Sequence, residues 1–350
     1  MRIDLFNFVA TLVKIAAVMG GLLSVPAAMN WVERRVSAWI QDRVGPNRVG
    51  PFGLFQPLAD ALKFFMKEDI VPGHVHKAVY ILAPGAAVTA ALTAFSVIPF
   101  GPTLTLFGRE IALVIADVNV GVLLTLAATS MGVYGIVMAG WSSNNKFSLM
   151  GGLRSSAQLI SYELAMGLAV ISVLAMSDTL RLTLIVEQQG RLWNVFLNPI
   201  GALIFMIGSF AETNRAPFDL PEAESELVAG YHTEYSSMKF TMFFMAEYVN
   251  MATSAALFTT LFLGGWHLPI PGIEGHLSGN LLAVAGILSF CLKVAAYMFF
   301  FVWVRWTLPR FRYDQLMNLG WKVLIPLAFA NIFLIGGLVA LGVPGWGGQG

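Results

Sequence analysis

The sequence predicts an all-α integral membrane protein, a polytopic bundle of about eight transmembrane helices with an interfacial amphipathic helix in its first cytoplasmic loop. The chain is 57% hydrophobic and only 12% charged, against about 25% charged residues in an ordinary soluble domain. Apolar runs of about 20 residues, the length of helix that crosses a hydrocarbon core of ~30 Å, recur along the chain. They are continuous rather than alternating, which favours helices over a closed barrel. Residues 1–350 are therefore expected to form a single membrane domain.

The first apolar run covers about residues 5–29 and ends near Trp31, Arg34 and Arg35. A signal peptide would carry its positive charges before the apolar region and a small-residue cleavage site after it, so we expect a retained first span. The further spans are predicted at residues 79–100, 117–140, 159–176, 195–210, 240–265, 281–304 and 323–341.

Lysine and arginine residues outside the spans are distributed unevenly between the two sides. Arg2, Arg109, Arg181 and Arg191 fall on one side, whereas a much larger set, from Arg34 to Lys322, falls on the other. Because positively charged loops stay in the cytoplasm, the larger set is predicted to be cytoplasmic and both termini periplasmic. The expected location is the bacterial inner membrane.

The first cytoplasmic connection, about residues 30–78, is the longest. Its Gly-Pro pairs favour turns or extended chain over helix and would hold Arg43 and Arg48 on stiff backbone. From Pro57 to Lys67 the apolar residues recur at helical spacing, which is typical of a helix lying in the membrane interface. A helix that simply caps the bundle would show the same periodicity.

Carboxylates concentrate in the segment from Gly208 to Glu234, which lies between two apolar runs. Six of the 20 acidic residues of the chain fall there, although positively charged residues dominate the other cytoplasmic connections. The orientation rule does not explain this segment, so we expect it to be functional. The six are Glu212, Asp219, Glu222, Glu224, Glu226 and Glu234.

Four charged residues fall within the predicted spans: Asp117, Glu163, Glu247 and Lys293. A buried carboxylate normally pairs with a cation, takes up a proton or faces water, so a proton or ion path and a structural salt bridge are both open. Asp117 also fits an interfacial position, and Lys293 fits a buried pair with a carboxylate. If Glu163, Glu212 and Glu247 face one another, they would exchange protons as a relay.

Signatures of bound redox centres and of nucleotide hydrolysis are missing from the sequence. The five histidines all lie in connections, so they cannot ligate a haem between spans, and the single cysteine, Cys291, excludes an internal disulfide framework and a cysteine-ligated cluster. His74 and His76 offer only two metal ligands, which favours an ordinary loop pair. The net charge of +1 points to no nucleic-acid partner. We expect no bound cofactor or metal, and any electrons would come from a partner.

Several motifs carry a resemblance that spans the chain in order. They are Trp31-Val-Glu-Arg-Arg-Val, Arg43-Val-Gly-Pro-Asn-Arg-Val-Gly-Pro, the segment from Gly140 to Arg154, Gln158-Leu-Ile-Ser-Tyr-Glu, and the segment from Ala211 to Ser236. The sequence closely resembles the H-subunit family of bacterial respiratory complex I, the proton-pumping NADH:quinone oxidoreductase, whose mitochondrial counterpart is NADH dehydrogenase subunit one.

The resemblance implies a membrane-arm subunit of a translocase in the respiratory chain. Such a subunit forms much of the quinone chamber and couples quinone reduction to proton translocation. Flavin and iron–sulfur clusters would lie in partner subunits, which comprise the hydrophilic-arm quinone module and the antiporter-like membrane subunits.

The resemblance also implies roles for individual residues. Glu163, Glu212 and Glu247 would belong to a buried acidic proton relay. Glu33, Arg34 and Arg35 would lie near the quinone entry, with Arg43 and Arg48 on the loop beyond. The remaining quinone-binding or coupling residues would be Asp219, Glu222, Glu224 and Glu226.

Two other classes stay open. The membrane anchor of a related membrane-bound hydrogenase would share much of the sequence, although the full Arg-Val-Gly-Pro-Asn-Arg and Glu-Thr-Asn-Arg-Ala-Pro-Phe-Asp-Leu motifs favour the respiratory subunit. A stand-alone ion-coupled transporter would suit the composition and span count equally well, but it would not explain the acidic cytoplasmic loop.

Overall fold

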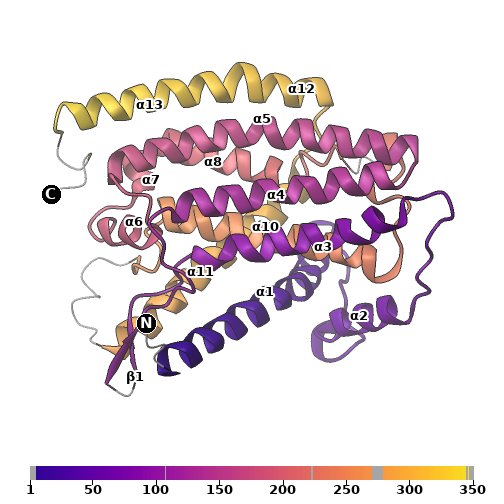
Figure 1. The fold of residues 1–350 in the computed structure, drawn as a ribbon, viewed down its shortest axis with the longest axis horizontal. Helices are drawn as coiled ribbons and strands as arrows, with labels where there is room; N and C mark the ends of the chain where they lie inside the picture. The colour runs from indigo at the N-terminus through magenta and orange to yellow at the C-terminus, as the bar shows by residue number, and fades with distance from the viewer. Residues whose placement is uncertain (1–4, 107, 222–223, 270–278, 344–345, 347–350) are drawn as a thin grey trace.

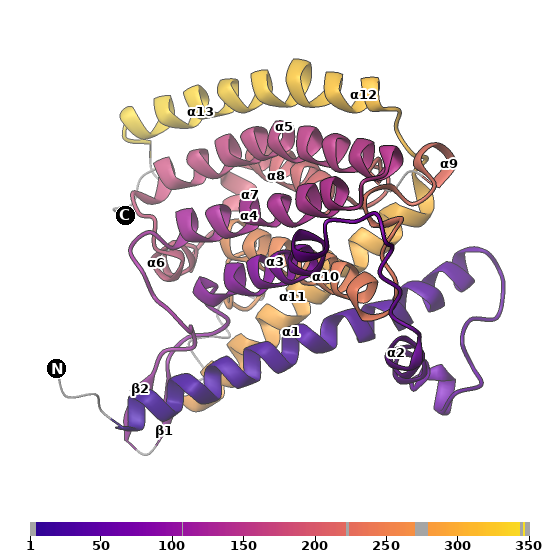
Figure 2. The ribbon, with the colours of Figure 1, turned by 45° about the vertical axis from the view of Figure 1, so that its right-hand side comes forward.

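The computed structural model describes residues 5–106, 108–221, 224–269, 279–343 and 346. These residues form helices that lie largely side by side, with α13 along one edge and α1 toward the opposite one (Figure 1, Figure 2). Six helical segments are long and apolar enough to cross a membrane, which confirms the prediction of an all-α polytopic membrane protein. They are α1 (Leu5–Ile40), α3 (Lys77–Ala94) with its 3-10 extension η2 (Phe95–Val97), α4 (Gly121–Ser142), α5 (Lys146–Ser177), α11 (Asn280–Thr307), and the continuous run of α12 (Tyr313–Asn318), η5 (Leu319–Leu324) and α13 (Ile325–Ala340).

The fifth predicted span corresponds to two helices rather than one. A single turn, α7 (Asn194–Leu197), is followed by α8 (Pro199–Glu212). Between them, the side chain of Asn198 accepts a hydrogen bond of 2.9 Å from the backbone N–H of Gly201. This cap, with proline in the first helical turn, explains why the helix restarts there.

The sixth predicted span corresponds to α10 (Ser237–Phe262), which lies inside the bundle. Every residue from Met251 to Phe262 is buried, and the helix packs against α1, α3, α8 and α11. Because its neighbours are other helices rather than lipid, α10 can carry polar side chains toward protein partners. Glu247 is therefore held within the protein.

Glycine allows α4 to pack closely between α3 and α5. A Cβ atom on Gly135 of α4 would stand 2.8 Å from the Cβ of Ala87 in α3, and one on Gly140 would stand 2.6 Å from the backbone oxygen of Ser148 in α5. Small residues permit this approach between membrane helices. The central part of α4 is thereby placed next to α5 and near α8.

The first helix is longer than predicted, because α1 runs 36 residues to Ile40 rather than ending near Met29. At a rise of 1.5 Å per residue it is about 54 Å long, well beyond a hydrocarbon core of ~30 Å. Glu33, Arg34 and Arg35 therefore lie on a helix and not in an irregular connection. The prediction of non-helical backbone holds only further along, where Arg43 and Arg48 lie outside helices.

The amphipathic segment forms helix α2 (Gln56–Met66), after the 3-10 turn η1 (Pro51–Gly53). The structure thus confirms a helix here. None of its residues is buried, and the apolar side chains of Leu58 and Phe65 are 62% and 68% exposed. An apolar face turned away from the bundle suits contact with lipid.

Two of the charged residues assigned to spans have local partners. Helix α4 begins at Gly121, so Asp117 lies before it, where it forms an ion pair with Arg181. Lys293 of α11 donates hydrogen bonds to the carbonyl oxygens of Leu263 at 2.7 Å and His267 at 2.6 Å, just beyond the end of α10. A cation at a helix C-terminus is favoured by the helix dipole. Lys293 thus holds the chain that leaves α10.

Short elements complete the described chain. A hairpin of β1 (Leu104–Leu106) and β2 (Arg109–Ile111) pairs antiparallel, with Thr105 opposite Glu110. The sequence did not predict this hairpin, because three-residue strands are too short for an alternating pattern to be recognised. The other short elements are α6 (Leu182–Gln188), α9 (Glu224–Leu227) and η3 (Gly230–His232).

Candidate functional site

A buried cluster of charges joins helices that are far apart in the sequence. Arg215 lies in the chain just after α8. Its guanidinium contacts Glu33 of α1 through Nη1 at 2.6 Å and Glu247 of α10 through Nε at 2.6 Å. Arg305 of α11 contacts the other oxygen of Glu33 at 2.9 Å. We call Glu33, Arg215, Glu247 and Arg305 the ion cluster.

Arg215 is the centre of the ion cluster. Its side chain is only 4% exposed, and its guanidinium carbon lies 4.3 Å from the ring centroid of Tyr248, whose hydroxyl donates to Glu33 at 3.1 Å. Burial lowers the pKa of an arginine, but the Glu247 and Glu33 carboxylates more than offset this and hold the pKa of Arg215 well above its ordinary value. Arg215 is thus a permanent cation that fixes both carboxylates.

On one side of the ion cluster lies a cavity of about 390 Å³ between α1, α2, α10 and α11, which we call the chamber. Most of its wall is apolar, with Phe64, Phe240 and Phe244 among the lining residues. Glu33, Tyr248 and Arg305 supply polar groups to the same wall. An apolar cavity of this size with a few convergent polar groups is typical of a small-molecule site.

The mouth of the chamber is held by α2. Asp60 of this helix forms an ion pair with Arg34 of α1 at 2.9 Å and accepts a hydrogen bond from Asn30 at 3.3 Å. The neighbouring Arg35 donates to the Pro46 carbonyl at 3.2 Å. Of the two arginines predicted near a quinone entry, Arg34 lines the chamber and Arg35 anchors the following loop. Arg43 and Arg48, predicted on the loop beyond, are exposed.

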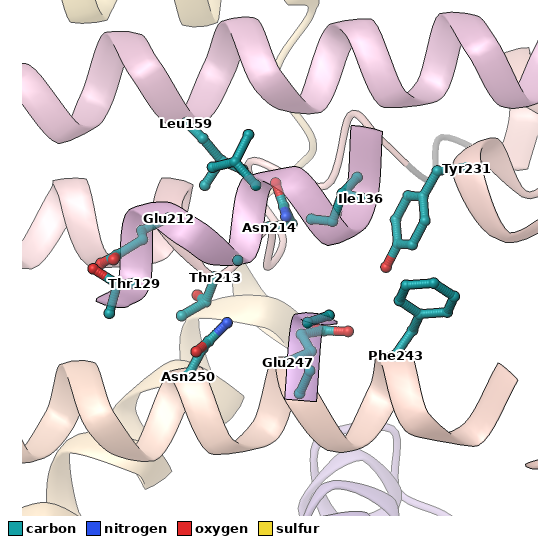
Figure 3. Close-up of a pocket in the computed structure, with 14 residues that line it drawn as sticks. Thr129, Ile136, Leu159, Glu212, Thr213, Asn214, Tyr231, Phe243, Glu247 and Asn250 are labelled. Atoms are coloured by element: carbon teal, nitrogen blue, oxygen red, sulfur yellow. The ribbon is translucent and has the colours of Figure 1, made fainter. Parts of the chain in front are cut away.

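On the other side of Glu247 is a smaller cavity of about 40 Å³, the inner cavity. Polar side chains of α4, α8 and α10 line it, including Thr129, Glu212, Glu247 and Asn250 (Figure 3). A water molecule needs about 10–15 Å³ and two to four polar partners, so the inner cavity can hold a few waters. Glu247 thus belongs both to the ion cluster and to a space suited to water.

Glu212 and Glu163 have hydroxyl groups as neighbours, and we call them the carboxyl pair. Ser254 donates to Glu212 at 3.2 Å, and Ser130 donates to Glu163. Thr129 lies beside the Glu212 carboxylate (Figure 3). Within the part of the chain that the structure describes, no lysine or arginine forms an ion pair with either member.

Glu163 also lines a third space, a groove of about 540 Å³ between α4, α5 and α13. Its other walls are mostly apolar, and Leu126, Ile160 and Phe329 are among them. We call it the outer groove. The structure therefore brings Glu212 and Glu247 to the inner cavity, whereas Glu163 faces a separate space across one turn of α4.

The acidic loop between α8 and α10 contacts helix α5 and the segment that follows α11. Asp219 forms an ion pair with Arg310 at 2.8 Å, and Glu226 forms one with Arg154 at 2.6 Å. The Gln158 side chain of α5 donates to the carbonyl oxygens of Ala211 and Phe218, each at 2.9 Å. Glu222 lies outside the described residues, and of Glu224 only the backbone, in α9, is described.

Sequence reasoning missed several of these partners. Arg215 was visible as the one arginine inside an acidic segment, a signal that could have marked it as a bridging cation. Arg305 and Tyr248 gave no comparable signal. Thr129 and Ser130 gave none either, because hydroxyl residues are common in membrane helices.

Comparisons with known proteins agree over nearly the whole chain. A family model described as NADH dehydrogenase matches residues 13–336. The NADH-quinone oxidoreductase H subunit of Salinibacter ruber is 53% identical over 342 residues, which cover 94% of this chain and 96% of that protein. The corresponding H subunit of Protochlamydia amoebophila is 55% identical over 310 residues, covering 88% and 91%. NADH-quinone oxidoreductase subunit 8 of Rhodothermus marinus is 51% identical over 339 residues, covering 93% and 95%.

Proposed function

Since the chain belongs to the NADH dehydrogenase family and is a membrane subunit of an NADH-quinone oxidoreductase, we propose that it forms much of the quinone-binding chamber and couples quinone reduction to proton translocation. Its partners are other subunits of that complex. We place the quinone headgroup in the chamber and assign the proton path to the inner cavity and the carboxyl pair.

One observation carries the proposal: Arg215 is shared between a carboxylate of the chamber and a carboxylate of the inner cavity. Glu33 lines the chamber, Glu247 lines the inner cavity, and both contact Arg215 at 2.6 Å. A change of charge beside Glu33 must therefore alter the balance of forces on Arg215 and, through it, on Glu247. The two spaces are linked by electrostatics through one guanidinium.

Reduction of a quinone supplies such a change, because two electrons add negative charge to the headgroup until two protons, drawn from neighbouring groups or water, neutralise it. Two unit charges about 4 Å apart interact by about 4 kcal/mol at an effective dielectric of about 20, which is enough to move a proton equilibrium by several orders of magnitude. A charge that forms or disappears next to Glu33 would change how strongly Arg215 interacts with Glu33, and therefore with Glu247. Glu247 would then change the proton affinity of the inner cavity and of Glu212.

The walls of the chamber suit a lipid-soluble substrate. The apolar face of α2 is exposed, and its opposite side carries Asp60 and Phe64 into the chamber wall. A quinone tail would enter along such a helix, while its headgroup would meet Glu33, Tyr248 and Arg305. The electrons would come from flavin and iron–sulfur clusters of a hydrophilic arm, and Asp219 and Glu226 would hold the loop that faces it.

We further propose an inner-membrane location with both termini periplasmic. The basic residues near the C-terminal ends of α1 and α11, and those in and after α2, support this orientation by the positive-inside rule. Neighbouring membrane subunits would receive the proton signal from the carboxyl pair. They would be the antiporter-like subunits of the complex.

Two neighbouring alanines of α1 test the chamber. Both are exposed, but Ala27 lines the chamber, whereas Ala28 is not part of its wall. We expect Ala27→Trp to fill the chamber and lower NADH:quinone activity about tenfold or more, with Ala28→Trp close to the parent. Reduction of an artificial acceptor that takes electrons upstream of the quinone reports on assembly and should not change in either variant. Equal quinone activities in the two variants would refute the chamber assignment.

A further inference from the structure

The carboxyl pair is divided by a single turn of α4 that carries two consecutive hydroxyls. Thr129 lines the inner cavity with Glu212, and Leu126 lines the outer groove with Glu163. Ser130 comes next in the chain and contacts Glu163. This turn of α4 therefore lies between the inner cavity and the outer groove.

The hydroxyl of Ser130 has two acceptors within reach but only one proton. Its Oγ lies 2.7 Å from the carbonyl oxygen of Leu126 and also within hydrogen-bond reach of Glu163 Oε1. A serine hydroxyl donates one hydrogen bond and accepts others. It can therefore serve either acceptor, but not both at full strength at the same time.

The choice between the acceptors depends on whether Glu163 carries a proton. When Glu163 is protonated, its O–H donates to Ser130 Oγ, and the serine hydroxyl donates to the Leu126 carbonyl. When Glu163 is ionised, the serine hydroxyl turns and donates to the carboxylate, in a charge-assisted bond. Serine gains or loses no proton in this exchange, because only its hydroxyl rotates.

The Leu126 carbonyl keeps a side-chain donor when Ser130 turns away. Thr129 Oγ1 lies 3.0 Å from the same oxygen. A carbonyl inside a helix also accepts from the backbone N–H four residues further on, so the rotation does not leave the Leu126 oxygen without a donor. The Leu126 carbonyl thus keeps a donor in both arrangements of the turn.

We propose that Ser130 is a positioning residue that switches its hydroxyl between the Leu126 carbonyl and Glu163, so that Glu163 can hold a proton received from Glu212 of the inner cavity and release it to an acceptor of a neighbouring subunit at the outer groove. The inference rests on the proposed proton path through Glu163. It adds the rotation of the Ser130 hydroxyl, which lets Glu163 keep a hydrogen bond both when it is ionised and when it is protonated. A guanidinium could not do this, because it only donates. It also assigns the Leu126–Ser130 turn as the boundary between the two spaces.

Three variants of the complete complex, reconstituted in vesicles, test the inference: Ser130→Ala, Ser130→Thr and Glu163→Gln. We expect S130A to lower proton translocation and coupled quinone reduction about tenfold, with S130T restoring most of both, because threonine keeps the hydroxyl. E163Q should lower both at least as far as S130A. Upstream electron transfer to an artificial acceptor checks that each variant is assembled.

An infrared difference spectrum supplies a readout that a merely structural role would not move. The carboxyl C=O band that disappears in E163Q should shift in frequency in S130A and return toward the parent position in S130T. If E163Q is impaired while S130A matches the parent in rate and band position, the role of Ser130 is overturned and the proposed function stands. If E163Q itself translocates protons like the parent, the path through Glu163 fails, and the inference fails with it.

Discussion

The two sets of buried carboxylates in this protein differ in what holds them. In the ion cluster, Glu33 and Glu247 contact the nearly fully buried guanidinium of Arg215. In the carboxyl pair, Glu212 and Glu163 contact serine hydroxyls. A guanidinium is permanently charged and holds its carboxylates in place by ion pairs, whereas a hydroxyl can donate to an ionised carboxylate or accept from a protonated one. The difference teaches that burial alone does not make a carboxylate a proton carrier, because the group that contacts the carboxylate also determines whether it can exchange a proton.

This contrast assigns different tasks to residues that looked alike in the sequence. Glu163, Glu212 and Glu247 each lie in or at the end of an apolar run, and they were predicted together as one relay. The structure gives Glu247 a cationic partner, so we interpret it as the receiver of the charge signal. Glu212 and Glu163 remain as the candidates that exchange the proton.

Removing the central cation should have the largest effect. Arg215→Met would leave Glu33 and Glu247 buried with much of their charge uncompensated, and breaking a buried ion pair in this way costs about 3–5 kcal/mol. We expect the assembled complex to fall to a small fraction of the parent level in membranes. The matched control is the double variant R215M/E247Q, which removes one of the stranded charges and should recover part of the level. A single variant that accumulates normally would contradict the role of Arg215.

Adding a cation to the inner cavity should convert the carboxyl pair into a second ion cluster. Asn250 lines this cavity with Glu212, so Asn250→Lys would supply an ammonium to it. A unit charge about 4 Å away contributes about 4 kcal/mol at an effective dielectric of about 20, which should fix Glu212 as a carboxylate and reduce proton translocation at least about tenfold. Asn250→Gln keeps a neutral amide and serves as the control. Translocation by reconstituted N250K at the rate of N250Q would break the contrast.

The outer guanidinium of the ion cluster should matter less than the inner one. Arg305 contacts Glu33 at 2.9 Å, but its side chain is 36% exposed, against 4% for Arg215. Solvent screens such a contact, so Arg305→Gln should cost about 1 kcal/mol or less. The measurement is the midpoint temperature of thermal inactivation, compared directly with R215M. A loss of stability as large as that of R215M would show that the exposure of these two arginines does not predict how much each contributes.

The smallest effect is expected at the surface pair of Arg154 and Glu226. The two side chains meet at 2.6 Å, but Glu226 is 54% exposed. A double-mutant cycle with Arg154→Gln and Glu226→Gln should give a coupling energy of about 0.2–1 kcal/mol, as for other exposed pairs. A coupling energy of several kcal/mol would indicate that this pair holds the acidic loop in place. The pair would then resemble the buried contacts of the ion cluster in strength.

Much of the fold followed from the sequence, because apolar runs and helical periodicity are local signals. The helix from Gln56 to Met66 was predicted within a residue or two from the spacing of Leu58, Leu62 and Phe65. The extension of α1 past Met29 was missed, because a long helix can leave the membrane and carry Glu33 and Arg34 without any change of periodicity. The hairpin at Leu104–Ile111 was missed because its strands are too short to show a pattern.

The residues of the site were predicted better than their pairing. Glu163, Glu212 and Glu247 stood out as charges within or at the end of apolar runs, and Glu33 was selected from the family resemblance. Their partners depend on tertiary contacts: Arg215 reaches Glu33 across 182 positions, and Arg305 reaches it across 272. A single sequence carries no signal for such distances, so the division between ion cluster and carboxyl pair required the structure.

The most direct test of the central claim is proton translocation by Glu212→Gln in vesicles that contain the complete complex. The control is Glu187→Gln on α6, an exposed carboxylate that lines none of the three spaces. The account predicts that E212Q loses proton translocation and slows coupled quinone reduction, while E187Q matches the parent and upstream electron transfer is intact in both. Unchanged quinone reduction together with unchanged proton translocation in E212Q would contradict the assignment of Glu212 to the proton path.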